Sequence, residues 1–318
     1  MGIELSLILF FIGFYILIKG AKTLVNGAVS VARIFNISNW FIGVVIVGIG
    51  TSIPELSINL ASVFNGNTIG LGTIIGSNTF NILFILGISA LFYPILMKKE
   101  WVLKDFVFNI LAVIIAAFFI IFPVFGDSDF LGVTRGEALF LLALFVGWIL
   151  YMFYRKHSNE SGSDYKIFSV FTSFIMVLAG IVGVFIGGRW VVGGAETIAE
   201  LFGASESLIG LTIIAIGTSL PELTVSVVAL LRKRIGIAVG NIVGSNIFDF
   251  LGIIGITALL RPIATFPSVQ FDIFAALGAA LLLFAFTFIG RKYILSRLEG
   301  LIFIAGYIVY LVLIIWRG

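Results

Sequence analysis

Two short stretches place a proline and a glutamate inside long apolar runs: GTSIPEL at residues 50–56 and GTSLPEL at residues 217–223. A charge in mid-bilayer costs about 2.5–3.5 kcal/mol on insertion scales, so Glu55 and Glu222 are candidate functional residues. Pro54 and Pro221 have no N–H and displace the carbonyl four residues earlier. Backbone oxygens freed at membrane depth require a partner, and a bound cation would serve. The alternatives are a plain proline kink and a protonated, structural glutamate.

Each glutamate belongs to a polar stripe at helical spacing. Ser52, Glu55, Asn59 and Ser62 step by three or four residues and therefore share one helix face. Ser219, Glu222 and Ser226 repeat this pattern in the second stretch. We expect these faces to line a hydrated path or to contact the other half of the protein.

A second paired motif follows each glutamate: GTIIGSNTFNI at residues 72–82 and GNIVGSNIFDF at residues 240–250. Ser77 and Asn81 lie four residues apart on one face, and Ser245 and Asp249 occupy the same places in the second copy. The glycines at the first and fifth positions form small-x-x-x-small patterns that allow helices to pack closely.

The candidate ligands are all hard oxygen donors. They comprise the carboxylates of Glu55, Glu222 and Asp249, the amide of Asn81 with Asn78 and Asn246 as further candidates, the hydroxyls of Ser52, Ser77, Ser219 and Ser245, and the loosened carbonyls. Calcium takes six to eight oxygen ligands, whereas zinc and copper prefer His or Cys. Cysteine is absent, and the single histidine, His157, lies in a polar linker. Two or three carboxylates can neutralise either one divalent ion or a few monovalent ions. A shared set of ligands that neutralises one load or the other, but not both, is the physical basis of antiport.

Composition places these motifs in a membrane. The chain of 318 residues is 60% hydrophobic and 11% charged, with a mean hydropathy of +1.21. Soluble proteins carry about 25% charged residues, so we expect an all-α integral membrane protein. Ten segments are long and apolar enough to span the bilayer: 3–32, 39–64, 69–95, 104–124, 136–154, 166–200, 206–230, 236–260, 269–290 and 298–316.

The motif pairs divide the chain into two repeats of five spans each, residues 1–165 and 166–318. An odd number of spans makes the second repeat enter the membrane from the opposite side, which is typical of secondary transporters. Most of the 19 Lys and Arg residues fall at one set of span ends, which we assign to the cytoplasm. Both termini are then extracellular.

Together the motifs resemble the α-repeats of the cation/calcium exchanger superfamily, in its sodium/calcium exchanger branch and of the prokaryotic type without a regulatory domain. The resemblance covers essentially the whole chain. It implies electrogenic exchange of three Na⁺ for one Ca²⁺ by alternating access, normally extruding Ca²⁺ from the cell. It also implies a multi-pass protein of the cell membrane that acts as a monomer, with no cofactor, no enzymatic activity and no nucleic-acid partner.

The resemblance also implies roles for individual residues. Glu55 and Glu222 would be central ligands shared by calcium and sodium, with Asn81 and Asp249 completing the middle of the site. The sodium sites would be filled by Ser52, Ser77, Ser219 and Ser245 and by the backbone at Thr51 and Thr218. Thr73 departs from the pattern, because the second repeat has Asn241 there and asparagine is usual in the family at both positions.

The same residues are also compatible with other functions. Asn81 paired with Asp249 also resembles potassium-dependent exchangers, and proton/calcium exchangers belong to the same superfamily. A cation channel could use the same carboxylates as a filter, and flux coupling would distinguish it. An intramembrane hydrolase would need a Ser–His pair, an aspartate dyad or a metal site, and the apolar segments contain no histidine.

Overall fold

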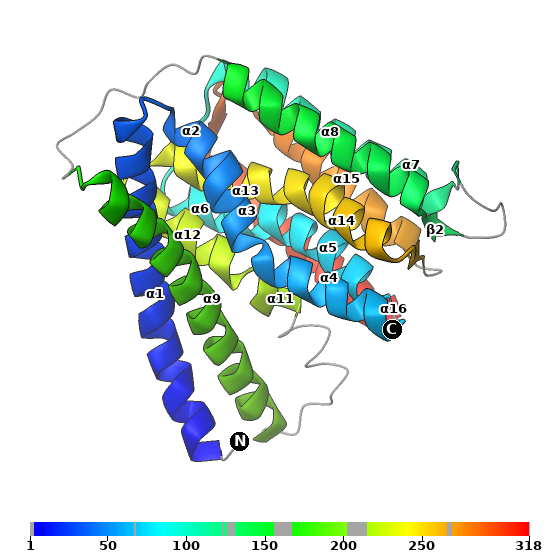
Figure 1. Ribbon diagram of the computed structural model, residues 1–318, viewed down its shortest axis with the longest axis horizontal. Coiled ribbons are helices and arrows are strands. Elements are labelled where there is room, and N and C mark those ends of the chain that lie inside the picture. The colour runs from blue at the N-terminus through cyan, green and yellow to red at the C-terminus, as the bar shows by residue number, and fades with distance from the viewer. Residues whose placement is uncertain are drawn as a thin grey trace. The chain divides into compact units, whose positions relative to one another are not determined.

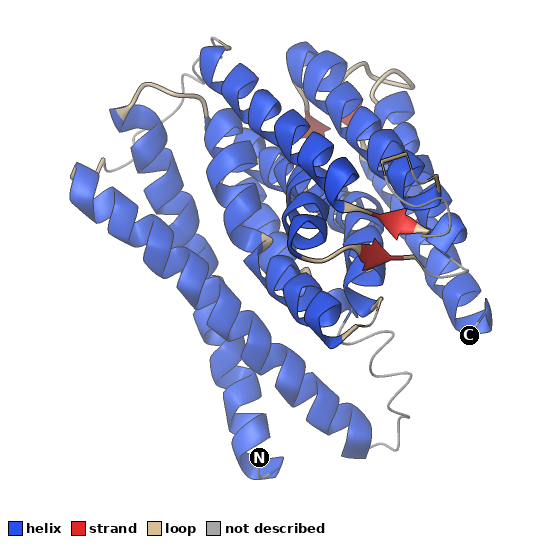
Figure 2. Ribbon diagram, turned by 45° about the vertical axis from the view of Figure 1, so that its right-hand side comes forward, coloured by secondary structure: helices blue, strands red, loops and turns tan. Residues whose placement is uncertain are grey.

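A computed structural model describes residues 3–66, 68–122, 124–125, 131–155, 167–201, 215–265 and 269–317. These residues are almost entirely helical, as Figure 2 shows. Helices satisfy every internal backbone donor and acceptor within one segment, which the bilayer interior requires. The expectation of a helical membrane protein is therefore confirmed. The linker around His157 and the acidic loop 126–129 lie outside the described residues.

Among the described residues, eight helices are long and apolar enough to span a membrane. They are Glu4–Ile34, Ile69–Phe92, Trp101–Ile121, Arg135–Tyr154, Val170–Ala199, Ile235–Leu260, Val269–Phe286 and Arg297–Trp316. The segments Asn39–Thr51 and Ile53–Asn65, separated by a break, qualify together as one more. Residues 206–214 of the expected seventh span are not described, so the count of ten spans stays a prediction.

The labels of Figure 1 follow the chain. The helices in the first half are α1 (Ile3–Ile34), α2 (Asn39–Phe41), α3 (Gly48–Thr51), α4 (Ile53–Asn65), α5 (Ile69–Phe80), α6 (Gly87–Phe92), α7 (Val107–Ile121) and α8 (Arg135–Tyr154). Those in the second half are α9 (Val170–Leu201), α11 (Ala215–Thr218), α12 (Leu220–Leu231), α13 (Ile235–Ile247), α14 (Ile254–Leu260), α15 (Val269–Phe286) and α16 (Arg297–Arg317).

In the described part of the chain, four π-helical segments interrupt these helices: η1 (Ile42–Val47), η2 (Asn81–Leu86), η3 (Trp101–Phe106) and η5 (Phe248–Ile253). The structure also corrects the all-α expectation in a small way. Strand β1 (Ile95–Leu96) pairs antiparallel with β4 (Ile294–Leu295), and β2 (Gly132–Val133) pairs antiparallel with β3 (Ile263–Ala264). The two-residue strands lie in connections, where the chain leaves the helical spans and needs other partners for its backbone groups.

The described contacts divide the chain into two compact units, Met1–Thr51 with His157–Asn241 and Arg317–Gly318, and Ser52–Lys156 with Ile242–Trp316. Each unit draws segments from both halves of the sequence. The expected repeats, residues 1–165 and 166–318, are defined by internal symmetry. A division by contacts does not test that symmetry, so the repeats stay a prediction.

In the first unit, α1 and α9 lie side by side over most of their lengths (Figure 1). Their interface is lined by glycines seven residues apart, at positions 13, 20 and 27 of α1 and 180, 187 and 194 of α9. A Cβ placed on Gly20 would lie 2.7 Å from the Val184 nitrogen, and one on Gly187 would lie 2.4 Å from the Leu17 nitrogen. The absence of side chains at these positions is thus what allows the two backbones to approach so closely.

In the second unit, α4 packs on α5, α15 packs on α5 and α7, and α14 packs on α8. Gly87 of α6 meets Gly300 of α16, since a Cβ on Gly87 would lie 3.0 Å from the Gly300 carbonyl oxygen. Many large apolar side chains, such as Phe118 and Phe153, are exposed while polar ones are buried. This inversion suits a body surrounded by lipid.

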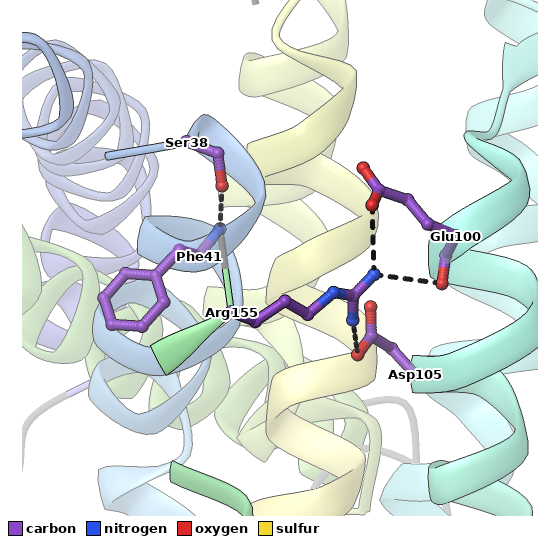
Figure 3. A network of polar contacts seen from close by, with 5 residues as sticks. All are labelled: Ser38, Phe41, Glu100, Asp105 and Arg155. Carbon is purple, nitrogen blue, oxygen red and sulfur yellow. Dashed lines mark hydrogen bonds and ion pairs between the residues drawn. The ribbon is translucent and has the colours of Figure 1, made fainter. Parts of the chain in front are cut away.

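An ion-pair network joins the end of α8 to η3 in the second unit (Figure 3). Arg155 Nη1 donates to Asp105 Oδ1 at 2.8 Å, and Nη2 donates to the Glu100 carbonyl at 3.2 Å. In the first unit, the Ser38 hydroxyl caps α2 by accepting from the Phe41 N–H at 3.1 Å (Figure 3). Such caps and pairs fix where the helices begin and end.

Candidate cation-binding site

Both copies of the glutamate motif contain a break in the helix at the serine. Ser52 has φ −85° and ψ 9° between α3 and α4, and Ser219 has φ −90° and ψ 6° between α11 and α12. Pro54 and Pro221 follow in the first turn of the new helix, where a missing N–H is tolerated. The expected proline-induced break is confirmed, and it lies two residues before each proline.

The polar stripes are buried as expected. Ser52, Glu55, Asn59 and Ser62 of the first stripe are each at most 5% exposed, whereas the neighbouring Ile53 is 42% exposed. Ser219, Glu222 and Ser226 of the second stripe are each at most 1% exposed. Each motif helix thus turns its carboxylate inward, away from the apolar face.

The second motif forms two cross-repeat amide contacts, both within the second unit. Asn78 of α5 donates through Nδ2 to Asp249 Oδ2 at 2.9 Å, and Asn81 of η2 donates to Asn246 Oδ1 at 3.0 Å. Asn78 and Asn246 hold equivalent positions, as do Asn81 and Asp249, so the contacts are related by the repeat. The structure therefore places Asn81 and Asp249 each in contact with an asparagine of the other motif copy.

Asn81 and Asp249 also lie in π-helical segments: Asn81 begins η2, and Asp249 is the second residue of η5. A π-helical turn lengthens the i→i−4 bonding pattern, and such turns are frequent at functional sites. The sequence reasoning missed these two segments, because nothing in the residue types separates a π-helix from an α-helix.

Three buried amides present acceptor oxygens. Asn59 Nδ2 donates to the Glu55 carbonyl at 2.9 Å, and Asn78 Nδ2 also donates to the Ile74 carbonyl at 2.7 Å. The Oδ1 atoms of Asn59, Asn78 and Asn81 are buried and have no hydrogen-bond partner among the described residues. The orientation of the Asn59 and Asn78 amides follows from the chemistry, since a flipped amide would face a backbone carbonyl oxygen, which can only accept. Amide oxygens of this kind are ligands that Ca²⁺ and Na⁺ accept.

In the first unit, Asn241 of α13 organises the surroundings of Glu222. Its Nδ2 donates to Ser226 Oγ at 3.0 Å and to the Glu222 carbonyl at 3.3 Å. Its Oδ1 accepts from the Thr51 hydroxyl at 3.0 Å. From the sequence, Asn241 was noted only as the counterpart of Thr73. Its position directly after the first glycine of the second motif could have marked it as a candidate functional residue.

The remaining expected ligands are buried on the same elements. Ser77 donates its hydroxyl to the Ile74 carbonyl at 3.0 Å and keeps its oxygen as an acceptor. Ser219 Oγ has no hydrogen-bond partner among the described residues. The first unit holds Thr51, Thr218, Ser219 and Glu222, and the second holds Ser52, Glu55, Ser77, Asn81, Ser245 and Asp249. No group of three His, Cys, Asp or Glu side chains that could bind a metal occurs among the described residues.

The close packing expected of the glycines in the second motif is confirmed at Gly240, whereas Gly76 has no described neighbour at the Cβ position. A Cβ on Gly240 would lie 3.0 Å from the Trp40 carbonyl oxygen and 3.1 Å from the Val44 nitrogen, so this glycine permits close packing. A Cβ on Gly76 would meet no described atom within 4 Å. Gly76 is therefore not needed for close contact with any of the described helices.

Buried carboxylates and acceptor oxygens on broken, paired membrane helices define a class of protein, the polytopic ion transporters. A model of the family described as "Sodium/calcium exchanger protein" matches residues 5–154 and 172–316. Because this match covers most of the chain, the protein belongs to the sodium/calcium exchanger family.

Individual relatives align over nearly their whole lengths. The uncharacterized membrane protein MJ0091 of Methanocaldococcus jannaschii is 34% identical over 305 residues, covering 94% of this chain and 95% of its own. Sodium/calcium exchanger MaX1 of Methanosarcina acetivorans is 27% identical over 360 residues, covering 99% of each. A solved structure of the sodium-calcium exchanger NCX_Mj superimposes with a TM-score of 0.82 at 32% identity, covering 97% of this chain and 98% of that one.

Proposed function

We propose that this protein is a secondary antiporter that exchanges Na⁺ for Ca²⁺ across the membrane by alternating access. The observation that carries the proposal is the set of buried carboxylate and amide oxygens on the paired motif helices of a sodium/calcium exchanger family member. The proposed exchange is three Na⁺ for one Ca²⁺ and moves net charge. An inward sodium gradient then drives calcium out of the cell.

The proposed ligands act as a shared set. Glu55 and Glu222 neutralise either calcium or sodium, and Asn81 and Asp249 complete the middle of the site. The hydroxyls of Ser52, Ser77, Ser219 and Ser245 and the backbone at Thr51 and Thr218 serve sodium. Coupling arises because these oxygens can neutralise one load or the other but not both together.

The proposed topology has ten spans in two inverted repeats, residues 1–165 and 166–318, with both termini extracellular. Most basic residues then face the cytoplasm, as the positive-inside rule requires. The chain contains no cysteine. Single cysteines introduced near the termini and in each connection can therefore be tested for labelling by an impermeant reagent on intact cells. Labelling of both ends of one five-span half from the same side would contradict the inverted repeat.

The function is tested by radioactive calcium uptake into proteoliposomes loaded with Na⁺ and diluted into sodium-free medium. We expect uptake only when sodium is inside. Uptake should be faster when a valinomycin-clamped potential makes the interior positive, because three Na⁺ leave for each Ca²⁺ that enters and one net positive charge moves outward. Vesicles loaded with K⁺ instead of Na⁺, and vesicles carrying an acid-inside proton gradient, are the matched controls. Calcium entry without any gradient would identify a channel and contradict the proposal.

Potassium dependence is a second candidate, favoured by the occurrence of Asn81 and Asp249 at equivalent positions, each bonded to an asparagine of the other motif copy. The same uptake assay, run with Na⁺ inside and with or without K⁺ outside together with calcium, separates the two. Uptake that requires K⁺ on the calcium side would identify a potassium-dependent exchanger. Uptake unaffected by K⁺ supports simple sodium/calcium antiport.

A further inference from the structure

Each motif glutamate has a backbone carbonyl that accepts a side-chain amide. The Glu55 carbonyl accepts from Asn59 Nδ2 at 2.9 Å, and the Glu222 carbonyl accepts from Asn241 Nδ2 at 3.3 Å. A carbonyl oxygen has two lone pairs, so it can take an amide besides a helical N–H. Both glutamates lie in the first turn after the break, where the chain has fewer helical bonds to hold it.

The two amides come from positions that are not equivalent in the repeat. Asn59 stands four residues after Glu55, where the second repeat has Ser226. Asn241 follows the first glycine of the second motif, where the first repeat has Thr73. The amide that reaches the glutamate carbonyl is therefore on the glutamate's own helix in one repeat and on the next helix in the other.

This difference changes what each amide connects. Asn241 links α13 to α12 through Glu222 and Ser226, and it links α13 to α3 by accepting from Thr51 at 3.0 Å. Among the described residues, Asn59 donates to a carbonyl of its own helix, α4, and the Thr73 hydroxyl donates to the Ile69 carbonyl at 2.9 Å. In the first repeat the Glu55 carbonyl is therefore bonded by Asn59 and not by the residue at the Asn241 position, Thr73.

We propose that Asn59 and Asn241 are equivalent positioning residues, which hold the backbone of Glu55 and Glu222 from different helices. The proposal rests on the proposed function, because it concerns the glutamates of that cation site. Asn59 takes over in the first repeat the task that Asn241 performs in the second. It follows that the amide can be moved between the two helices of either repeat with recovery of function.

The test exchanges the residues in pairs. Asn241→Thr removes the amide from the second repeat, and Asn241→Thr/Ser226→Asn gives that repeat the first-repeat arrangement. Asn59→Ser and Asn59→Ser/Thr73→Asn do the converse in the first repeat. Asn109→Ser, which alters a buried amide of α7 outside both motifs, is the matched control. Each purified variant is checked for a single peak in size exclusion before reconstitution.

The readout is the half-saturating calcium concentration of sodium-driven uptake, measured separately from the maximal rate. We expect Asn241→Thr to raise it about tenfold and Asn59→Ser about threefold, because the first loses bonds to several elements and the second only one. Asn241→Thr/Ser226→Asn should recover to within about threefold of wild type and Asn59→Ser/Thr73→Asn to about the wild-type value, and Asn109→Ser should not change the value. A double variant no better than its single parent, or single variants equal to wild type, would overturn the proposal.

A second readout separates this proposal from the proposed function. The rise in melting temperature on adding calcium to the purified variants in detergent reports binding without transport. Calcium stabilisation of the wild type without sodium-driven uptake contradicts the antiport. The ranking of the variants by their calcium-induced rise in melting temperature still tests the positioning role. If Asn241→Thr does not fold, the first-repeat pair decides the question. No calcium stabilisation and no uptake by the wild type would contradict both.

Discussion

The two copies of the glutamate motif agree in their backbone and differ in their amides. Both break at the serine with nearly the same φ and ψ, and both bury the glutamate one turn later. The amide on the glutamate carbonyl, however, comes from α4 in the first copy and from α13 in the second. The comparison teaches that the shared motif fixes the helix break, while the side chains around it can be distributed differently.

The largest expected effect tests what the two copies share. Glu55→Gln and Glu222→Gln should each abolish sodium-driven calcium uptake, since each removes one charge from the proposed site while keeping the side-chain volume. The measurement is uptake into sodium-loaded proteoliposomes, with Glu4→Gln near the start of α1 as a control for losing a carboxylate elsewhere. Exchange at the wild-type rate by either motif variant would exclude that glutamate from the site.

A large but unequal effect is expected at the paired amides of the second motif. Asn78 donates to the Asp249 carboxyl, whereas Asn246 accepts from the neutral Asn81 amide. Hydrogen bonds to charged groups are worth about 1.5–3 kcal/mol and neutral ones about 0.5–1.5 kcal/mol. Asn78→Ala should therefore raise the half-saturating calcium concentration at least about tenfold, and Asn246→Ala less. Equal losses would indicate that the Asp249 carboxyl is neutral when calcium binds.

An intermediate effect on stability is expected at the glycines that the repeats share in α1 and α9. Gly20→Ala and Gly187→Ala each place a Cβ within 2.7 Å of the partner backbone. Such overpacking costs about 1–3 kcal/mol and should lower the melting temperature in detergent. Gly193→Ala in α9 is the control, because its Cβ would meet no described atom within 4 Å. A variant of Gly20 or Gly187 as stable as that control would contradict the close packing of these helices.

The smallest effect is expected at Thr51, whose backbone is the proposed ligand. Thr51→Val keeps the backbone and removes the hydroxyl bond to Asn241 Oδ1. One neutral hydrogen bond is worth about 1 kcal/mol, so calcium half-saturation should rise about fivefold or less. Thr51→Ser keeps the hydroxyl and should behave like the wild type. A complete loss of transport in Thr51→Val would mean that the hydroxyl itself is a ligand.

Much of the candidate site was predictable from the sequence because charged residues are rare in apolar membrane-spanning segments. Glu55 and Glu222 stand out in apolar runs, and the 3.6-residue period places Asn59 and Ser62 on the same face as Glu55. The repeated spacing also predicted that Ser77, Asn81, Ser245 and Asp249 serve corresponding roles. These inferences need only local helix geometry and the cost of a charge in lipid.

Only the tertiary structure decided which polar atoms pair with one another. The contacts of Asn78 with Asp249 and of Asn241 with Glu222 join residues 171 and 19 positions apart in the chain. Helical periodicity assigns a residue to a face, but the partner of that face depends on how several helices pack. The sequence by itself therefore determined the membrane class and the motif helices, and it predicted oxygen ligands for a cation. The structure decided that Asn59 and Asn241 bond the carbonyls of the two motif glutamates from different helices, because distance in space, and not motif position, sets a hydrogen bond.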